Sequence, residues 1–155
     1  MQVISIENEA LRDLMKYGSV LLLKMICMSI LTSAYRAVYQ SFPVEEDAKA
    51  VAGEDKEMQR KLLVKNPNVE RIRLAHLNDL ENIVPFFIIS MLYIASEPSP
   101  QTAKLLFQIF VGSRFAHTVI YLNGVRQPLR GMAFTVGFLV NFYMAIQVLL
   151  VSAWL

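Results

Sequence analysis

The stretch from Met132 to Leu155 contains no Asp, Glu, Lys or Arg. At a rise of about 1.5 Å per residue, a helix of this length reaches roughly 36 Å, enough to cross a hydrocarbon core of about 30 Å. A segment in lipid must satisfy its backbone hydrogen bonds internally, which favours a helix. We therefore expect an all-α membrane protein.

Composition supports lipid as the solvent of this chain. Hydrophobic residues make up 55% and charged residues 18% of the sequence, against about 45–50% and about 25% in soluble domains. The net charge is only +2, and no Lys/Arg-rich run with interleaved aromatic residues indicates a nucleic-acid surface. The single cysteine, Cys27, excludes an internal disulfide and is expected to be a small buried hydrophobic side chain.

Three further apolar stretches complete a predicted bundle of four transmembrane helices. The turn Glu97–Pro100 and the pair Asn123–Gly124 separate the later helices, because these residue types favour turns and helix ends. Pro128 is typical of the first turn of a helix. The expected helices cover residues 10–40, 69–96, 102–123 and 129–153 of a single domain, with one long loop at 41–68.

Lys and Arg residues are unevenly distributed between the two ends of this bundle. Most of them lie in the 41–68 loop and its flanks, and the turn between the third and fourth helices adds Arg126 and Arg130. The opposite end holds Arg12, Lys16 and Lys104. The positive-inside rule therefore places the long loop in the cytosol and both chain ends in the lumen.

The second expected helix carries more polar side chains than a membrane span normally tolerates. At about 100° per residue, a broad polar stripe and a separate polar edge run along it. The stripe holds Arg71, Asn78, Glu81, Asn82 and Pro85, and the edge holds Arg73 and His76. Pro85 removes a backbone hydrogen bond and is expected to kink the helix beyond Glu81.

The third expected helix repeats this pattern with Arg114, His117 and Tyr121, whose spacing puts them on one face. The polar faces of the two helices should point toward each other or toward a neighbouring subunit. One interpretation is a structural ion-pair network, such as Glu81 with Arg114. Buried ion pairs are weak stabilisers, however, so the surplus of polar groups favours a ligand site. Lys24 in the first helix is expected to pair with an acid on a neighbouring helix, or else to snorkel.

The charge of this polar set favours an anionic ligand. Its arginines, which outnumber Asp79 and Glu81, are Arg36, Arg71, Arg73, Arg114 and Arg130. A planar guanidinium binds a carboxylate bidentately. Glu81 suits an amino group and Asn78 a peptide group, so a zwitterionic peptide such as glutathione fits this set.

A long motif in the second helix resembles the signature of a known family. The run from Val69 to Phe86 reads VERIRLAHLNDLENIVPF, and it is similar to the sequence typical of the MAPEG family of membrane-associated eicosanoid and glutathione proteins. The resemblance covers nearly the whole chain and is greatest toward the microsomal glutathione transferases of the first type. Further matching segments are Lys24–Met25, Glu46–Asp47, Phe110–Arg114, His117–Leu122 and Gln127–Gly131.

The resemblance implies a homotrimer of four-helix subunits that binds glutathione near the cytosolic side, between adjacent subunits. The matching glutathione contacts are Arg36, Arg73, His76, Asn78, Glu81 and Tyr121, with Arg114, His117 and Arg130 also near the site. Tyr121, or alternatively Arg130, is implied as the catalytic group that contacts the thiolate. No metal is implied. The expected location is the endoplasmic reticulum membrane or the outer mitochondrial membrane.

The activity that the resemblance implies is transfer of glutathione to hydrophobic electrophiles from the bilayer, with peroxidase activity on lipid hydroperoxides. Alternatives within the family are a glutathione-dependent isomerase like prostaglandin E synthase and a non-catalytic lipid-binding protein. Gly131 and Phe134 resemble the transferases, whereas Arg126 resembles the synthase. Two positions depart from the transferase pattern: Leu74 replaces a second arginine, and Ala48 replaces the reactive cysteine of vertebrate relatives.

Overall fold

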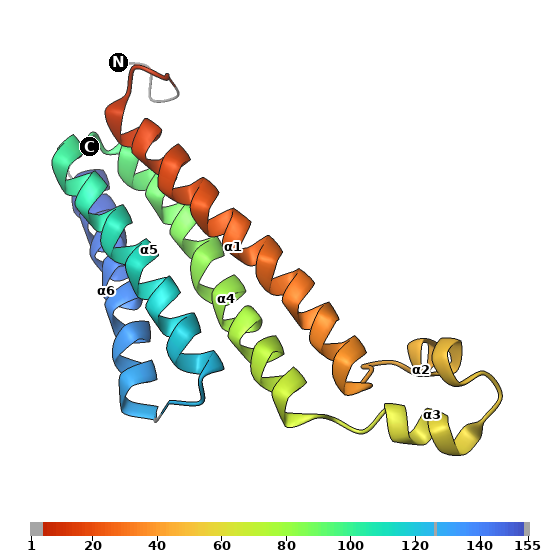
Figure 1. Ribbon diagram of the computed structural model, residues 1–155. Helices are drawn as coiled ribbons and strands as arrows, with labels where there is room; N and C mark the ends of the chain where they lie inside the picture. Colours follow the sequence, from red (N-terminus) through yellow and green to blue (C-terminus); the bar gives the residue numbers. More distant parts are fainter. Residues whose placement is uncertain (1–4, 126, 154–155) are drawn as a thin grey trace.

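The computed structural model describes residues 5–125 and 127–153. Within them all regular structure is helical, in six helices (Figure 1). Four are long: α1 (Glu9–Tyr39), α4 (Pro67–Ala95), α5 (Pro100–Leu122) and α6 (Gln127–Ser152). Each is long and apolar enough to cross a membrane, which confirms the prediction of four membrane-spanning helices. Arg126 and the last two residues of the uncharged stretch that begins at Met132 lie outside the described residues, whereas the expected fourth helix, 129–153, lies within them.

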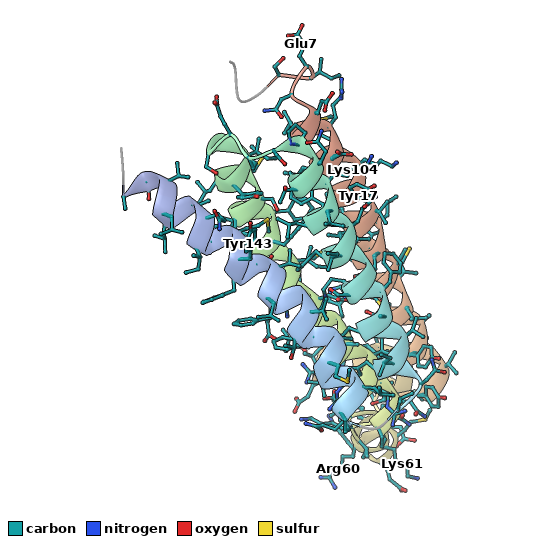
Figure 2. All side chains as sticks on the ribbon, turned by 90° about the vertical axis from the view of Figure 1, so that its left-hand side faces the viewer. Glu7, Tyr17, Arg60, Lys61, Lys104 and Tyr143 are labelled. Carbon is teal, nitrogen blue, oxygen red and sulfur yellow. The ribbon has the colours of Figure 1, made fainter. Side chains whose placement is uncertain are left out.

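The long helices form one bundle in which α1 and α6 each pack against both α4 and α5. The two short helices, α2 (Glu45–Ala52) and α3 (Lys56–Leu62), pack against each other. Figure 1 shows this pair at the end of the bundle where α1 finishes and α4 starts. In Figure 2, Arg60 and Lys61 of α3 mark this end and Glu7 marks the opposite one.

The helices α4 and α5 begin at residues whose side chains accept hydrogen bonds from the free backbone amides of the first turn. The Asn66 side chain accepts from the amide of Asn68 at the start of α4, and the Ser99 side chain accepts from the amide of Thr102 at the start of α5. Both helices have a proline in the first turn, where its missing N–H costs nothing. Gly124 has a φ of +65° in the turn before α6, in the left-handed region that glycine adopts readily.

Ser41 anchors the segment between α1 and α4. Its hydroxyl donates to the carbonyl of Val64 at 2.8 Å and accepts from the amide of Asn66 at 3.2 Å. The amide of Phe42 also donates to the carbonyl of Leu62 at 2.8 Å. These bonds bring the end of α1 beside the start of α4, and thereby position the polar residues at the loop end of both helices.

Aromatic packing holds α4 against α5 in the apolar half of the bundle. The fully buried rings of Phe86 and Phe110 stack with centroids 4.0 Å apart, and Phe107 meets Phe86 edge-on at 5.7 Å. The helix α4 continues through Pro85 to Ala95. Cys27 is exposed on α1, so the expectation of a buried cysteine was wrong. In a membrane protein the outer helix face is itself apolar and accommodates such a side chain.

Candidate functional site

Three charged side chains from three helices meet in the interior of the bundle: Lys24 of α1, Asp79 of α4 and Arg114 of α5. The Lys24 ammonium donates to one carboxylate oxygen of Asp79, and Arg114 Nη2 donates to the other at 2.9 Å. Lys24 is 7% exposed and the other two are fully buried. We call this group the buried triad.

Neighbouring polar groups also contact the buried triad, although Arg114 Nε and Nη1 have no hydrogen-bond partner among the described residues. Arg114 Nη2 also donates to Asn78 Oδ1 at 2.7 Å, and Thr118 Oγ1 donates to Asp79 at 3.4 Å. The pairing of Lys24 with an acid on a neighbouring helix confirms the expectation for that residue. Glu81 is exposed and makes no ion pair with any residue that the structure describes. The suggested pairing of Glu81 with Arg114 was therefore wrong, because Asp79 points inward instead.

A second polar region lies between α1 and α4, nearer the loop end. It is a pocket of about 200 Å³, which we call the α1–α4 pocket, lined by Ser29, Thr32, Ser33, Arg36, Arg73 and His76. The Nδ1 atom of His76 is buried and has no hydrogen-bond partner among residues 5–125 and 127–153. Arg36 and Arg73 also line an adjoining pocket of about 310 Å³ that extends toward the loop. The two arginines thus line both pockets, which together make up the polar region between α1 and α4.

Within this region Arg73 already holds a carboxylate. Its Nε and Nη2 atoms donate to the two oxygens of Glu70, at 3.1 and 2.9 Å. This forked geometry is the one in which guanidinium groups bind carboxylates most strongly. Both side chains remain partly exposed, so a ligand carboxylate can compete with Glu70 for Arg73.

The third polar region joins α5 to the start of α6. The rings of His117 and Tyr121 lie 5.6 Å apart, and the Arg130 guanidinium lies 4.5 Å from the centre of the Tyr121 ring. His117 is buried beside Arg114, with its Nδ1 at 3.4 Å from Nη2. Tyr121 therefore lies between a buried histidine and a partly exposed arginine, and its ring is held by a cation–π contact.

One chain does not bring all the predicted site residues together. His76 and Asn78 are two residues apart on α4, so their side chains point about 160° apart. His76 accordingly lines the α1–α4 pocket, whereas Asn78 accepts from Arg114 of α5. Arg36, Arg73 and His76 thus form one group, and the residues around Tyr121 form another.

Sequence reasoning missed the α1 wall of the α1–α4 pocket. Ser29, Thr32 and Ser33 precede Arg36 by seven, four and three residues, which places all four on one helix face. This spacing could therefore have indicated, from the sequence alone, that the three hydroxyl side chains lie on the same face as Arg36. In the described part of the chain, no three His, Cys, Asp or Glu side chains are grouped so that they could hold a metal ion.

These features define a four-helix membrane protein with charged residues in its spans and an open cationic pocket at one end. The chain belongs to the MAPEG family, whose family model matches residues 14–150. It is 43% identical over 143 residues to microsomal glutathione S-transferase 1 of Homo sapiens, and the aligned segment covers 92% of this chain and 91% of the relative. The Rattus norvegicus protein of the same name is 44% identical over 144 residues, with the same coverage. Prostaglandin E synthase of Homo sapiens is 33% identical over 142 residues, covering 92% of this chain and 90% of the relative.

Proposed function

We propose that the protein is a membrane-bound glutathione transferase. The observation that carries the proposal is the α1–α4 pocket, where Arg36 and Arg73 face a polar region and the buried His76 Nδ1 has no partner among the described residues. Glutathione offers two carboxylates to the arginines and polar backbone groups to the histidine. The higher identity to the glutathione S-transferases than to prostaglandin E synthase supports this activity over an isomerase.

In the proposed reaction the glutathione thiolate attacks an electrophilic carbon of a hydrophobic substrate. The sulfur lone pair forms the new C–S bond, and the leaving group departs with its bonding electrons. Cationic side chains favour the thiolate over the thiol. Arg130 supplies such a charge, and the Tyr121 hydroxyl donates a hydrogen bond to the sulfur. The bilayer delivers the apolar substrate. With a lipid hydroperoxide the thiolate instead attacks the O–O bond, which leaves the lipid alcohol and glutathione sulfenic acid, and a second glutathione converts the sulfenic acid to glutathione disulfide and water.

We also propose that the site is completed between copies of the chain in a homotrimer. The separation of His76 from Asn78 around α4 supports this arrangement, because a single small peptide cannot reach both sides of one helix. Residues on the Arg73 side of one copy then meet those on the Tyr121 side of another. The Lys- and Arg-rich loop end is the cytosolic end, in the endoplasmic reticulum or the outer mitochondrial membrane.

Measuring the affinity of the purified protein for glutathione by isothermal titration calorimetry tests the proposal. Arg73→Ala removes the forked donor and should weaken binding about 10- to 100-fold, as expected for losing hydrogen bonds to a charged group. Arg60→Ala is the matched control, because it removes an exposed arginine of α3 that lines neither pocket. Wild-type protein should conjugate chlorodinitrobenzene faster than it converts a prostaglandin endoperoxide. Failure to bind glutathione or to conjugate it would refute the proposal.

Co-expression of two variants tests the shared site. Arg73→Ala and Tyr121→Phe each disable one half, so mixed oligomers should contain some intact sites and recover part of the activity. A site within a single chain predicts no recovery, because every copy then carries one defect. The measurement is conjugation activity per oligomer after purification through different tags on the two variants.

A further inference from the structure

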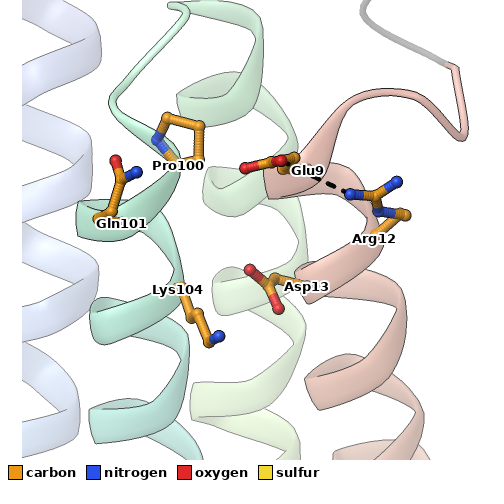
Figure 3. Close-up of a pocket in the computed structure, with 6 residues that line it drawn as sticks. All are labelled: Glu9, Arg12, Asp13, Pro100, Gln101 and Lys104. Atoms are coloured by element: carbon orange, nitrogen blue, oxygen red, sulfur yellow. Dashed lines mark ion pairs between the residues drawn. The ribbon is translucent and has the colours of Figure 1, made fainter.

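The seam between α1 and α5 carries a polar pocket at the end of the bundle opposite the loop. This pocket, which we call the polar mouth, has a volume of about 340 Å³ and is lined by Glu9, Arg12, Asp13, Pro100, Gln101 and Lys104 (Figure 3). It lies far along α1 from the α1–α4 pocket, so the proposed transferase reaction does not use it.

The charges in the polar mouth are balanced but not fully paired. Glu9 and Arg12 form an ion pair at 3.8 Å. Asp13 and Lys104 make no hydrogen bond or ion pair with another residue of the described ranges, and Figure 3 shows both side chains pointing into the gap between α1 and α5. An acid and a base that face the same gap without contact are complementary to a ligand with one charge of each sign.

Just below the polar mouth, Tyr17 and Gln108 bridge the same seam. The Gln108 amide donates to the Tyr17 hydroxyl at 2.7 Å, and each residue lies one helical turn beyond a residue of the mouth, Tyr17 after Asp13 and Gln108 after Lys104. Tyrosines with one polar and one apolar end are typical of the membrane–water interface. The bridge therefore marks the level at which the seam passes from the polar mouth into the hydrocarbon region.

An apolar groove of about 370 Å³ lies further along the same seam, beyond this bridge. Its walls include Val20, Leu23, Cys27 and Leu31 of α1 and Phe115 and Val119 of α5. Lys24 also lines it, but the Lys24 ammonium is bound by the buried Asp79. The α1 residues continue the face that holds Asp13, since their spacing follows the helical repeat. The groove lies on the face of α1 opposite Ser29, Thr32, Ser33 and Arg36 at about 100° per residue, so it is separate from the α1–α4 pocket.

The dimensions of the seam match one lipid leaflet. From Val20 to Leu31 the helix rises roughly 16 Å, close to half of a hydrocarbon core of about 30 Å. From Asp13 to Val20 it rises about 10 Å, which spans the interfacial layer between a headgroup and its acyl chains. A charged mouth and an apolar groove at these depths correspond to the two parts of one phospholipid.

We propose that the α1–α5 seam is a binding site for one phosphatidylethanolamine molecule. Lys104 binds the phosphate, Asp13 accepts hydrogen bonds from the primary ammonium group, and one acyl chain fills the groove. The paired acids and bases of the mouth favour a zwitterionic headgroup over a purely anionic one. A choline headgroup fits less well, because it cannot donate hydrogen bonds and no aromatic side chain lines the described mouth to form a cation–π cage.

Native mass spectrometry of the full chain tests this site. The protein is purified in mild detergent with equal amounts of phosphatidylethanolamine and phosphatidylcholine, and each retained lipid is identified by the mass that it adds to the protein. Wild type should retain the ethanolamine lipid with about tenfold preference, as expected for hydrogen bonds to charged groups. The double variant Asp13→Asn with Lys104→Gln should lose that preference. Lys16→Gln is the matched control, since Lys16 lies on the same end of α1 but outside the mouth.

A second pair of variants tests the groove. Val119→Trp should fill it and reduce the amount of retained lipid, whereas Val136→Trp on the outer face of α6 should not. Both valines are exposed, and unchanged helicity and glutathione binding serve as checks that the variants fold. Equal retention of the two lipids by wild type indicates surrounding bilayer lipid only and overturns the proposal. So does the absence of retained lipid, as when a second copy of the chain covers the seam.

Discussion

The buried triad and the α1–α4 pocket contain the same kinds of side chain, yet their surroundings give them opposite properties. In the triad, Asp79 is fully buried and receives hydrogen bonds from Lys24 and Arg114. In the pocket, Arg73 is partly exposed and holds only its neighbour on the same helix, and the Arg36 guanidinium has no ion-pair partner in the described ranges. Buried charges that are paired with one another are already neutralised, whereas cations that face an open polar space attract an anionic ligand.

The largest expected effect is the loss of stability on replacing Asp79. Asp79→Asn leaves two buried cations without a counter-charge, and breaking a buried pair from one side costs about 3–5 kcal/mol. We expect the variant to unfold at a much lower temperature in detergent. Asp47→Asn, an exposed acid on α2, is the matched control and should change the unfolding temperature little.

Replacing the whole triad separates its structural role from ligand binding. The variant Lys24→Met, Asp79→Leu, Arg114→Met removes all three charges together, and apolar replacements of buried ion pairs are often neutral. It should recover most of the stability lost in Asp79→Asn. If Asp79→Asn instead unfolds like wild type but binds no glutathione, the triad belongs to the ligand site and the contrast between the two regions fails.

Tyr121 lies outside the α1–α4 pocket, beside the ring of His117, which contacts Arg114 of the buried triad, and its removal should affect rate rather than stability. Its hydroxyl makes no hydrogen bond to another described residue, so it is available to the sulfur. Tyr121→Phe should lower the conjugation rate about 10- to 100-fold, the value expected for a hydrogen bond to a charged group. Glutathione affinity and unfolding temperature should stay close to wild type. Tyr143→Phe on the outer face of α6 is the control, and a similar rate for both variants would remove Tyr121 from the reaction.

The comparison also shows what could be predicted from the sequence. The four spans follow from apolar runs and from turn residues, since each is a local property of the chain. The partner of Arg114 could not be chosen that way, because Asp79 and Glu81 are both acids on one helix and only packing decides which points inward. The opposite directions of His76 and Asn78, by contrast, follow from helix geometry alone.

Replacing Glu70 should have a smaller effect on glutathione affinity. Its carboxylate accepts hydrogen bonds from both Nε and Nη2 of Arg73, which lines the α1–α4 pocket. Glu70→Gln removes a competing carboxylate, so glutathione affinity should rise by about 2- to 5-fold, the range expected for a partly exposed ion pair. Glu45→Gln on α2 changes the same charge away from the pocket and should leave affinity as in wild type. Weaker binding by Glu70→Gln would show that Glu70 orients Arg73 and does not compete with the ligand.

The smallest expected effect on glutathione affinity is that of replacing Leu74, which is 40% exposed on α4. It lies on the side of the helix that carries Asn78 and Glu81, four and seven residues further on. Leu74→Arg adds a cation there, where Glu81 partly neutralises it, so glutathione affinity should rise only about twofold. Leu74→Gln separates the added charge from the loss of an apolar side chain and should give no gain. Because Leu74 points about 100° away from Arg73 around α4, a gain with Leu74→Arg would support a glutathione site that extends around the helix and is completed by a second copy of the chain.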